Sequence, residues 1–230
     1  MARVRRIHQI FFRFGDRRLQ DYPIFVASLD AWRNMKGWKH RLWHEKGVER
    51  LCRTKYPQLW DTYRRLKFGI QRVDLAKYML ADAYGGVIVD LDVLPKCHVS
   101  EIVGDRPYVF DRCSRAHIIA NDFFYVGQQG LPGFCEAFKQ NLRRVNAIPV
   151  YRERKMRYIF NSSGPDFFSR FVKQAGLDEY VVAISHRTFL DPKQRHRSVS
   201  ADRSQIEVIH HLSWAPQLRG ADGNILAAPF

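Results

Sequence analysis

Two aspartates separated by one residue, Asp90 and Asp92, are the side chains whose spacing most directly suggests chemistry. In an extended chain, residues two positions apart point to the same side, so both carboxylates would face one ligand. Two carboxylates on one side repel each other unless a cation lies between them, and hard oxygen ligands suit Mg²⁺ or Mn²⁺. The pair therefore predicts a divalent metal site, with a solvated turn or a helix cap as the plain alternative.

The residues before the pair predict a helix followed by a buried strand. Between residues 71 and 84, apolar side chains recur at the period of a helix that packs on a core. Gly85 and Gly86 end this helix, because glycine readily adopts the left-handed conformation. The apolar run 87–89 is short, β-branched and uninterrupted, which is typical of a strand buried on both faces. In open α/β sheets ligands bind beyond the carboxyl ends of strands, where the aspartate pair falls.

The residues around the pair form a longer motif, which consists of Asp74, Lys77-Tyr78, Leu80, Tyr84-Gly85-Gly86 and Asp90-Leu91-Asp92. This motif closely resembles the sugar-nucleotide-binding region of DXD-containing glycosyltransferases. That group includes family 32-like enzymes such as the initiating α-mannosyltransferases of fungi, capsular sugar transferases and, more distantly, the large glucosylating toxins. The resemblance implies an α/β protein of GT-A type, with a single Rossmann-like, mixed and mostly parallel sheet flanked by helices. It also implies Mn²⁺ or Mg²⁺ as cofactor and a nucleotide diphosphate-sugar as donor.

Two residues of the predicted helix take a donor-binding role from this resemblance. Asp74 matches an aspartate that contacts the nucleotide-sugar, and Lys77 stands where the family usually has an arginine that reaches the donor. Lysine keeps the positive charge but lacks the bidentate fork of arginine. The same two residues are also spaced as a surface ion pair. Ile88 is a second departure, because relatives often have tyrosine there.

The start of the chain also matches the family. Residues 7–12 predict a first strand, and a similar opening in the family ends that strand beside the nucleotide. Phe11 stands where the family usually has tryptophan, so the resemblance implies that it stacks on the base, with a plain core role as the alternative. His8 belongs to the same opening and is assigned with Phe11 to the donor side, against the alternative of a hydrogen-bonded core histidine.

Asn121 and Asp122 come at the start of another predicted strand, over residues 121–126. Family members carry an asparagine just before the corresponding strand, close to the transferred sugar. The resemblance therefore places both residues at the catalytic site. Their alternative role is that of turn residues before a strand.

A last candidate segment lies at residues 210–214, where family members have a histidine and a Ser-Trp pair that fold back on the metal and diphosphate. The neutral imidazole of His210 or His211 can complete a metal shell, and the two histidines rank equally. Ser213 and Trp214 can hydrogen-bond phosphate oxygens.

The remaining sequence predicts scaffold. Helices are expected from periodicity or helix-start signals at residues 21–32, 56–68, 134–142 and 165–176. Strands are expected at residues 40–43, 108–110 and 206–209. The basic segment 191–203 is expected to be a loop. With 230 residues, 46% of them hydrophobic, and no linker, the chain is expected to form a single domain over 1–230. Its apolar runs are too short to cross a bilayer and its start lacks a secretory signal, so a soluble, cytoplasmic protein is expected.

The formal net charge of +15 favours polyanionic partners, namely nucleic acid, anionic membrane surfaces, nucleotide-sugars or acidic glycans. Because no RNA-recognition or helix-turn-helix signature is present, no specific nucleic acid partner is expected, whereas peripheral contact with an anionic membrane fits the charge. The four cysteines lack metal-binding spacing and are expected to be reduced thiols.

The function that the resemblance implies is transfer of a sugar from a UDP- or GDP-linked donor to a glycan or other hydroxyl acceptor, with retention of configuration. A metal held by Asp90 and Asp92 would neutralise charge on the leaving diphosphate. The sequence contains no compelling nucleophile or general base, which retention does not need if the leaving phosphate accepts the acceptor's proton. The alternatives are a basic nucleic-acid-binding protein, a metal-dependent nuclease or nucleotidyltransferase using the same pair, and a noncatalytic transferase.

Overall fold

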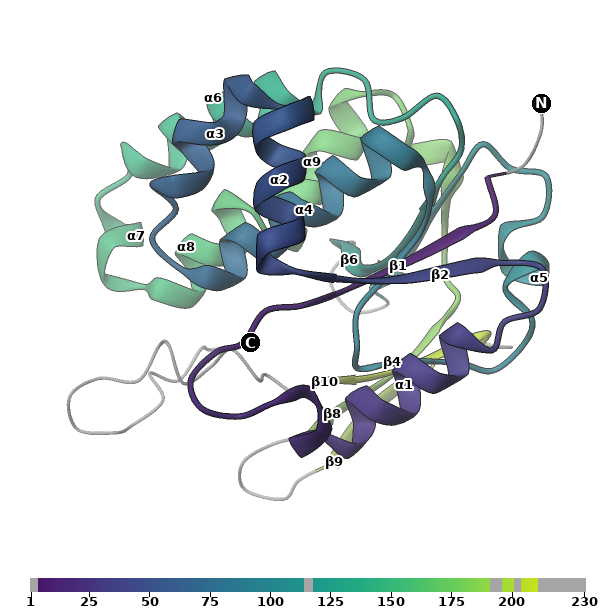
Figure 1. The fold of residues 1–230 in the computed structure, drawn as a ribbon. Helices are drawn as coiled ribbons and strands as arrows, with labels where there is room; N and C mark the ends of the chain where they lie inside the picture. Colours follow the sequence, from purple (N-terminus) through teal and green to yellow (C-terminus); the bar gives the residue numbers. More distant parts are fainter. Residues whose placement is uncertain (1–3, 114–117, 191–195, 201–203, 211–230) are drawn as a thin grey trace.

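The centre of the molecule is a six-stranded sheet with the strand order β2-β1-β3-β6-β5-β7 (Figure 1). The computed structural model describes residues 4–113, 118–190, 196–200 and 204–210. Strands β2, β1 and β3 are parallel, as are β5 and β7, while β6 is antiparallel to both of its neighbours. The strands are β1 (Arg6–Phe11), β2 (Lys39–His44), β3 (Gly86–Val89), β5 (Tyr108–Cys113), β6 (Ile118–Val126) and β7 (Val181–Val182). The mixed sheet flanked by helices that the sequence predicts is therefore confirmed.

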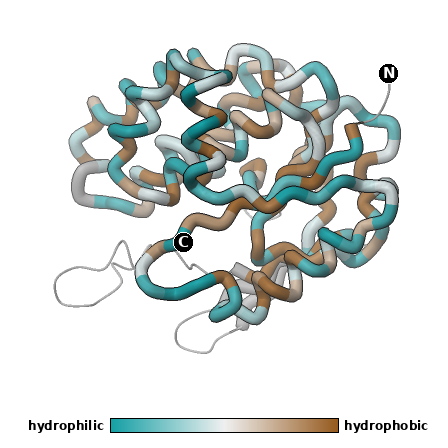
Figure 2. Tube along the Cα trace, in the orientation of Figure 1, coloured by the Kyte–Doolittle hydropathy of each residue, from teal (hydrophilic) through white to brown (hydrophobic). Residues whose placement is uncertain are grey.

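Helices cover one face of this sheet (Figure 1). They are α2 (Glu45–Lys55), α3 (Pro57–Arg64), α4 (Gly69–Tyr84), α6 (Phe134–Asn146), α8 (Lys155–Ser162) and α9 (Pro165–Gln174), with the short α7 (Val150–Glu153) at the outer edge. The largest apolar cluster lies between these helices and the sheet. Figure 2 shows the same arrangement as hydrophobic stretches along the strands and hydrophilic outer helix turns. Burial of this apolar surface is the main force that holds the helical layer to the sheet.

The opposite face carries α1 (Pro23–Arg33), α5 (Val99–Val103) and a second, smaller sheet (Figure 1). That sheet has the order β4-β10-β8-β9 and consists of β4 (Val93–Pro95), β8 (Ser185–Leu190), β9 (His196–Ser200) and β10 (Ile206–His210). The sequence did not indicate this sheet, and the loop expected over residues 191–203 is wrong where β9 forms. Helix α2 was also missed, and α3 ends at Arg64 instead of reaching Phe68.

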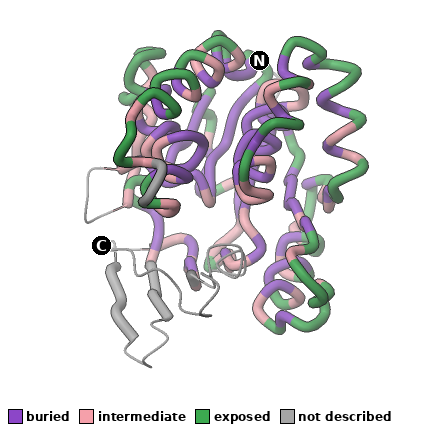
Figure 3. The backbone as a smooth tube through the Cα atoms, turned by 90° about the vertical axis from the view of Figure 1, so that its left-hand side faces the viewer, coloured by how far each residue is buried: buried purple, intermediate pink, exposed green. Residues whose placement is uncertain are grey.

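Strand β3 is buried on both faces, as its composition predicts. Val87 and Val89 pack toward α1, α5 and the small sheet, whereas Ile88 packs toward the helical layer. All three side chains are at most 1% exposed. Figure 3 shows buried segments through the middle of the molecule, between more exposed outer layers. The residues that follow β3 therefore leave the sheet from a rigidly packed position.

The glycine pair that joins α4 to β3 is required by backbone shape and by close packing. Gly85 has a φ of 59° and Gly86 a φ of 98°, which L side chains rarely adopt. A Cβ at Gly86 would lie 2.5 Å from the carbonyl oxygen of Arg6, and one at Gly85 would lie 2.6 Å from that of Gly127. The pair thus allows α4 and β3 to connect without displacing the neighbouring strands.

We expect Gly86→Ala to lower the free energy of unfolding by about 3 kcal/mol, the sum of backbone strain and overpacking. Gly133→Ala is the matched control, because Gly133 also has a positive φ but a Cβ there would meet nothing within 4 Å. The control should lose only about 1 kcal/mol. Urea unfolding of both variants measures the difference, and equal losses would show that close packing at Gly86 contributes nothing.

Candidate functional site

Asp90 and Asp92 lie in the connection between β3 and β4, where the chain turns. The Val93 amide donates to the Asp90 carbonyl oxygen at 3.2 Å, and the Asp90 amide donates to the Asp122 carbonyl oxygen at 2.8 Å. Leu91, between the two aspartates, is buried in an apolar cluster with side chains of α1. The extended geometry expected for the pair is therefore wrong, because the hydrogen bond between Val93 and Asp90 closes a turn over Leu91 and Asp92.

Three carboxylates act on one another at this turn. Burial raises the pKa of Asp90 to about 7; the Lys77 ammonium opposes this rise, and the negative charges of Asp92 and Asp122 add to it. Asp122 lies in β6, which pairs with β3 so that Val89 is opposite Phe123. The site is thus locally negative in a chain with a net charge of +15, an arrangement that favours a bound cation.

Lys77 is the cation that the protein itself supplies to this cluster. Its Nζ donates to Asp90 Oδ2 at 2.7 Å and lies 3.7 Å from Asp74 Oδ1. The side chain is 3% exposed, and although burial lowers its pKa, the charges of Asp90 and Asp74 outweigh this and hold the pKa above its usual value. Lys77 therefore stays charged, and its ammonium group points to two carboxylates from behind the turn.

Asp74 is the second buried link in this network. Its Oδ1 accepts from Asn121 Nδ2 at 2.9 Å and its Oδ2 accepts from Ser163 Oγ at 2.8 Å. Burial raises the pKa of the Asp74 carboxyl, while Lys77, Ser163 and Asn121 oppose this rise. Both oxygens are thus engaged within the protein. Asp74 holds Lys77 and Asn121 in place beside the turn.

Tyr78 and Ser163 belong to the same network but were not among the candidates. Asn121 Nδ2 also donates to the Tyr78 hydroxyl at 3.2 Å, and that hydroxyl donates to the Ser163 carbonyl oxygen at 2.6 Å. Tyr78 is part of the sequence motif and Ser163 precedes a Gly-Pro turn, so the sequence weakly indicated that both lie near the site. The structure brings together Asp74, Lys77, Asp90 and Asn121 from the predicted set and adds these two.

His8 is a core residue in this structure. Its Nδ1 accepts from Trp43 Nε1 at 3.0 Å, and its Nε2 lies 3.1 Å from the Gly85 carbonyl oxygen, to which it donates as a neutral ring. The residue is 3% exposed. These contacts agree with the core alternative, and they place the ring toward α4.

Phe11 is the last residue of β1, at the edge of the sheet from which the aspartate turn emerges. The side chain is half-buried and packs on the apolar cluster that holds Leu91. Its ring meets that of His44 edge-on, with centroids 6.4 Å apart. A stacking role on the base stays a prediction.

A pH experiment tests the burial of His8. Burial lowers its pKa to about 4; the Gly85 carbonyl opposes this, and the charges of Arg6 and Arg41 add to it. Because the unfolded chain binds the proton near pH 6.5, we expect stability to fall by about 3 kcal/mol from this residue as the pH drops from 6.5 to 4. Urea unfolding across this range should show a smaller fall in the free energy of unfolding for His8→Gln than for the wild type. His44→Gln, which removes an exposed histidine, is the control and should fall as the wild type does. An identical pH dependence in His8→Gln and wild type would contradict the assignment.

The structure describes only part of the segment at residues 210–214. The side chain of His210 and all of His211, Ser213 and Trp214 lie outside the described residues. The preceding backbone is described, and the Ile209 amide donates to the Asp92 carbonyl oxygen at 2.8 Å. Strand β10 thus brings the chain next to the aspartate turn just before this segment. The donor and metal contacts of these residues stay predictions.

The donor atoms at the turn fit a metal shared with a substrate. Mg²⁺ and Mn²⁺ take oxygen ligands, and Mg²⁺ is usually held by one or two carboxylates plus substrate phosphates. Asp90 and Asp92 supply such carboxylates, with Oδ2 of Asp90 engaged by Lys77. Within the described ranges, no three His, Cys, Asp or Glu side chains are grouped so that they could hold a metal. The two carboxylates fit a divalent metal of the kind that also takes phosphate oxygens as ligands.

The comparisons with known proteins show which proteins the region around this site is similar to. Residues 25–109 match the family model described as the glycosyltransferase sugar-binding region containing the DXD motif. That range holds most of α1 and all of β2, α4, β3 and the aspartate turn. In fold, the chain is similar to the PaToxG glycosyltransferase, with a TM-score of 0.50 and 12% identity over 75% of this chain and 69% of that one.

Two particular relatives come from Saccharomyces cerevisiae. The chain is 34% identical over 55 residues to the mannosyl phosphorylinositol ceramide synthase SUR1, and 33% identical over 51 residues to the synthase CSH1. These alignments cover 24% and 22% of this chain, and 14% of each relative. The chain thus spans a small part of the length of the curated relatives that it matches.

These findings confirm the resemblance to DXD glycosyltransferases and the GT-A fold class. They do not favour a nucleic-acid-binding protein or a nuclease. No helix in the described part of the chain has the length and apolar character needed to cross a membrane. All four cysteines are free in this structure.

Proposed function

We propose that this protein is a metal-dependent glycosyltransferase that moves a sugar from a UDP- or GDP-linked donor to a hydroxyl group of a glycan or other acceptor. The observation that carries the proposal is the turn with Asp90 and Asp92 at the carboxyl end of β3, backed by buried Lys77, inside the matched sugar-binding region. The fold of a glycosyltransferase supports the same reaction class.

Asp90 and Asp92 are the residues that would hold the metal, together with the donor diphosphate. When bound there, Mn²⁺ or Mg²⁺ would neutralise the negative charge that develops on the leaving diphosphate. Lys77 contributes by opposing the rise in the pKa of Asp90 and by fixing its side chain, since its ammonium donates to one carboxylate oxygen at 2.7 Å. Asp74 anchors Lys77 and Asn121, so the packing of α4 sets the position of the turn.

Positioning and charge stabilisation then account for most of the proposed catalysis. Asn121 is 8% exposed and its amide nitrogen is engaged by Asp74 and Tyr78. Asp122, which is half-buried, is the more accessible of the two residues for contact with the transferred sugar. We propose that transfer proceeds with retention, in which the leaving phosphate accepts the proton of the acceptor hydroxyl and no enzymic base is needed.

The yeast relatives guide the choice of the first substrates. Both are named as mannosyl phosphorylinositol ceramide synthases, so mannose is the first sugar to test and an inositol phosphate headgroup is the first acceptor. UDP-linked sugars are the second group of donors to test. The acceptor of this chain is proposed only as a hydroxyl-bearing glycan or glycoconjugate.

Release of nucleotide diphosphate from a panel of GDP- and UDP-sugars tests the proposal. We expect release with one donor in the presence of Mn²⁺, faster with an acceptor, and none in EDTA. Asp92→Asn serves as the inactive control. The proposal would be overturned if no donor were consumed with Mn²⁺ and acceptor present while the folded protein bound RNA or DNA in a salt-sensitive manner.

A further inference from the structure

A second concave site lies along edge strand β2 of the main sheet, and none of its lining residues belongs to the aspartate turn or to the network of Asp74, Lys77 and Asn121. It is a pocket of about 310 Å³ that is lined by residues of β1 and β2 and by Tyr84 at the end of α4. Arg6 and Lys39 are the first residues of β1 and β2, which are parallel and in register. The aspartate turn follows the last residue of β3, which is also parallel to β1. The pocket is therefore separate from the site described above.

Three exposed cations surround this pocket, namely Arg6, Lys39 and Arg41. None of its described lining residues is acidic, and none of the three cations forms an ion pair with a described Asp or Glu side chain. Arg6 Nη1 donates to the Tyr84 carbonyl oxygen at 2.8 Å, which fixes its guanidinium at the rim. The pocket thus concentrates positive charge that the described protein does not neutralise.

The floor of the pocket is aromatic and rigid. His8 and Trp43 are buried, and Tyr84 is half-buried. The rings of Trp43 and Tyr84 stack with centroids 5.7 Å apart, and the Arg41 guanidinium lies 3.6 Å from the centre of the Trp43 ring. Stacking holds the guanidinium flat, so its outer edge can donate to an anion. Burial is the main cause of the low pKa of His8, and the positive charges of Arg6 and Arg41 lower it further.

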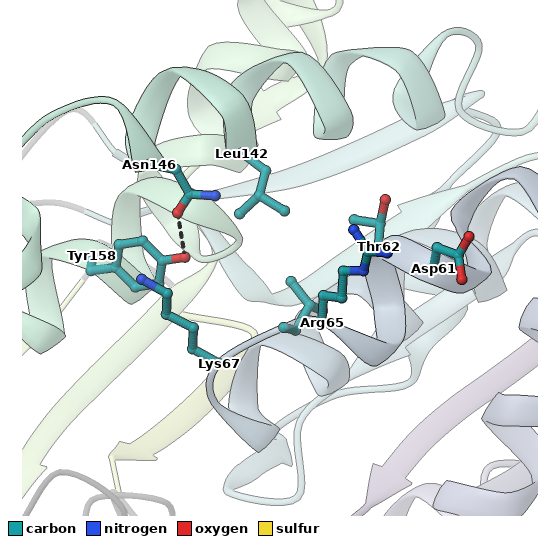
Figure 4. A pocket seen from close by; sticks show the side chains of 8 residues that line it. Asp61, Thr62, Arg65, Lys67, Leu142, Asn146 and Tyr158 are labelled. Atoms are coloured by element: carbon teal, nitrogen blue, oxygen red, sulfur yellow. Dashed lines mark hydrogen bonds between the residues drawn. The ribbon is translucent and has the colours of Figure 1, made fainter.

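Another pocket, whose lining carries charges of both signs, serves for comparison. It has about 220 Å³ and lies among α3, α6 and α8 (Figure 4). Arg65 and Lys67 line it, but Asp61 lines it too. The Tyr158 hydroxyl there donates to Asn146 Oδ1 at 2.8 Å, so part of its polar lining is already satisfied. Of these two pockets, it is the β1–β2 pocket that combines several cations with no acidic residue in its described lining.

We propose that the β1–β2 pocket binds a phosphate-bearing anion, either a phosphomonoester or a diphosphate. A group with two or more negative charges matches three converging cations, whereas one carboxylate would leave most of their charge uncompensated. Guanidinium groups recognise phosphate through paired N–H donors, which Arg6 and Arg41 present. The phosphate can belong to a soluble molecule or to a lipid headgroup, and the two sources share this chemistry.

Calorimetric titration of the full chain with sodium pyrophosphate in EDTA tests the proposal, because EDTA removes metal-dependent binding at the aspartate turn. We expect the double variant Arg6→Gln/Arg41→Gln to bind pyrophosphate about tenfold more weakly or worse. The control Arg65→Gln/Lys67→Gln removes the same total charge from the other pocket and should change affinity less than about twofold. Asp92→Asn should bind pyrophosphate as the wild type does, which separates this site from the donor site.

Cosedimentation with phosphatidylcholine vesicles that contain phosphatidic acid distinguishes the two sources. Vesicle binding that pyrophosphate competes away and that the Arg6→Gln/Arg41→Gln variant loses would assign the pocket to a lipid headgroup. Pyrophosphate binding without vesicle binding would assign it to a soluble ligand. No pyrophosphate binding by the wild type, or equal weakening in both double variants, would overturn the proposal.

Discussion

Asp92→Asn is expected to reduce metal-dependent turnover by about a hundredfold or more, the order of effect seen when one charge-stabilising group is removed from an active site. Asparagine keeps the shape of the side chain but removes the negative charge that the metal requires. Steady-state rates of nucleotide diphosphate release, measured at several Mn²⁺ concentrations, provide the test. The apparent affinity for Mn²⁺ should fall with the rate.

The same variant should fold normally. Asp92 is half-buried in a turn, and its charge raises the pKa of Asp90, so its removal relieves repulsion. Asp30→Asn is the control, because Asp30 is exposed on α1 and lies 3.9 Å from Arg33. We expect both variants to melt within about 2 °C of the wild type, because Asp92→Asn relieves a repulsion and the loss of an exposed pair such as Asp30–Arg33 has a small effect. Loss of the folded state in Asp92→Asn would show that the pair is structural.

Lys77→Met is expected to destabilise the fold by about 3 kcal/mol at pH 8. Methionine fills a similar volume but leaves Asp74 and Asp90 without the ammonium group that neutralises them, and removal of one partner of a buried ion pair has a cost of this order. Urea unfolding measures the loss. Lys77→Arg, which restores the residue usual in the family, should retain most of the stability because it keeps the charge.

The loss in Lys77→Met should depend on pH in a defined direction. Without the ammonium, burial raises the pKa values of Asp74 and Asp90 further above those of the unfolded chain, so the folded state binds more protons. The penalty is then full at pH 8 and shrinks as the pH falls toward 5. In a double-mutant cycle, Asp90→Asn should recover about 1.5 kcal/mol or more in the Lys77→Met background. A loss that is independent of pH and additive with Asp90→Asn would contradict the ion-pair account.

The elements that position the site could be predicted because their signals are local. The period of α4, the glycine pair and the β-branched run of β3 each involve residues close together in the chain, and the structure has all three. The glycine pair was predicted as the helix end, on the conformational freedom of Gly85, and Gly86 is the second member of that pair. The contact of Gly86 with Arg6, 80 positions earlier, was not predicted, because that contact depends on strand pairing.

The internal network could not be predicted for the same reason. Asp74 meets Ser163 across 89 positions and Asn121 across 47. The spacing of Asp74 and Lys77 fits an exposed ion pair as well as a buried one, and only tertiary packing decides between them. The small sheet was missed because β4 has three residues and β10 reaches it from far along the chain.

Thermal stability with a panel of UDP- and GDP-sugars, each with and without Mn²⁺, tests the central claim most directly. A donor at a hundred times its dissociation constant stabilises the folded state by about 2.7 kcal/mol, which shifts the melting temperature measurably. The account predicts a shift with one nucleotide class that requires Mn²⁺ and is lost in Asp92→Asn. The absence of a Mn²⁺-dependent shift with every donor, in a chain that is otherwise folded, would contradict it.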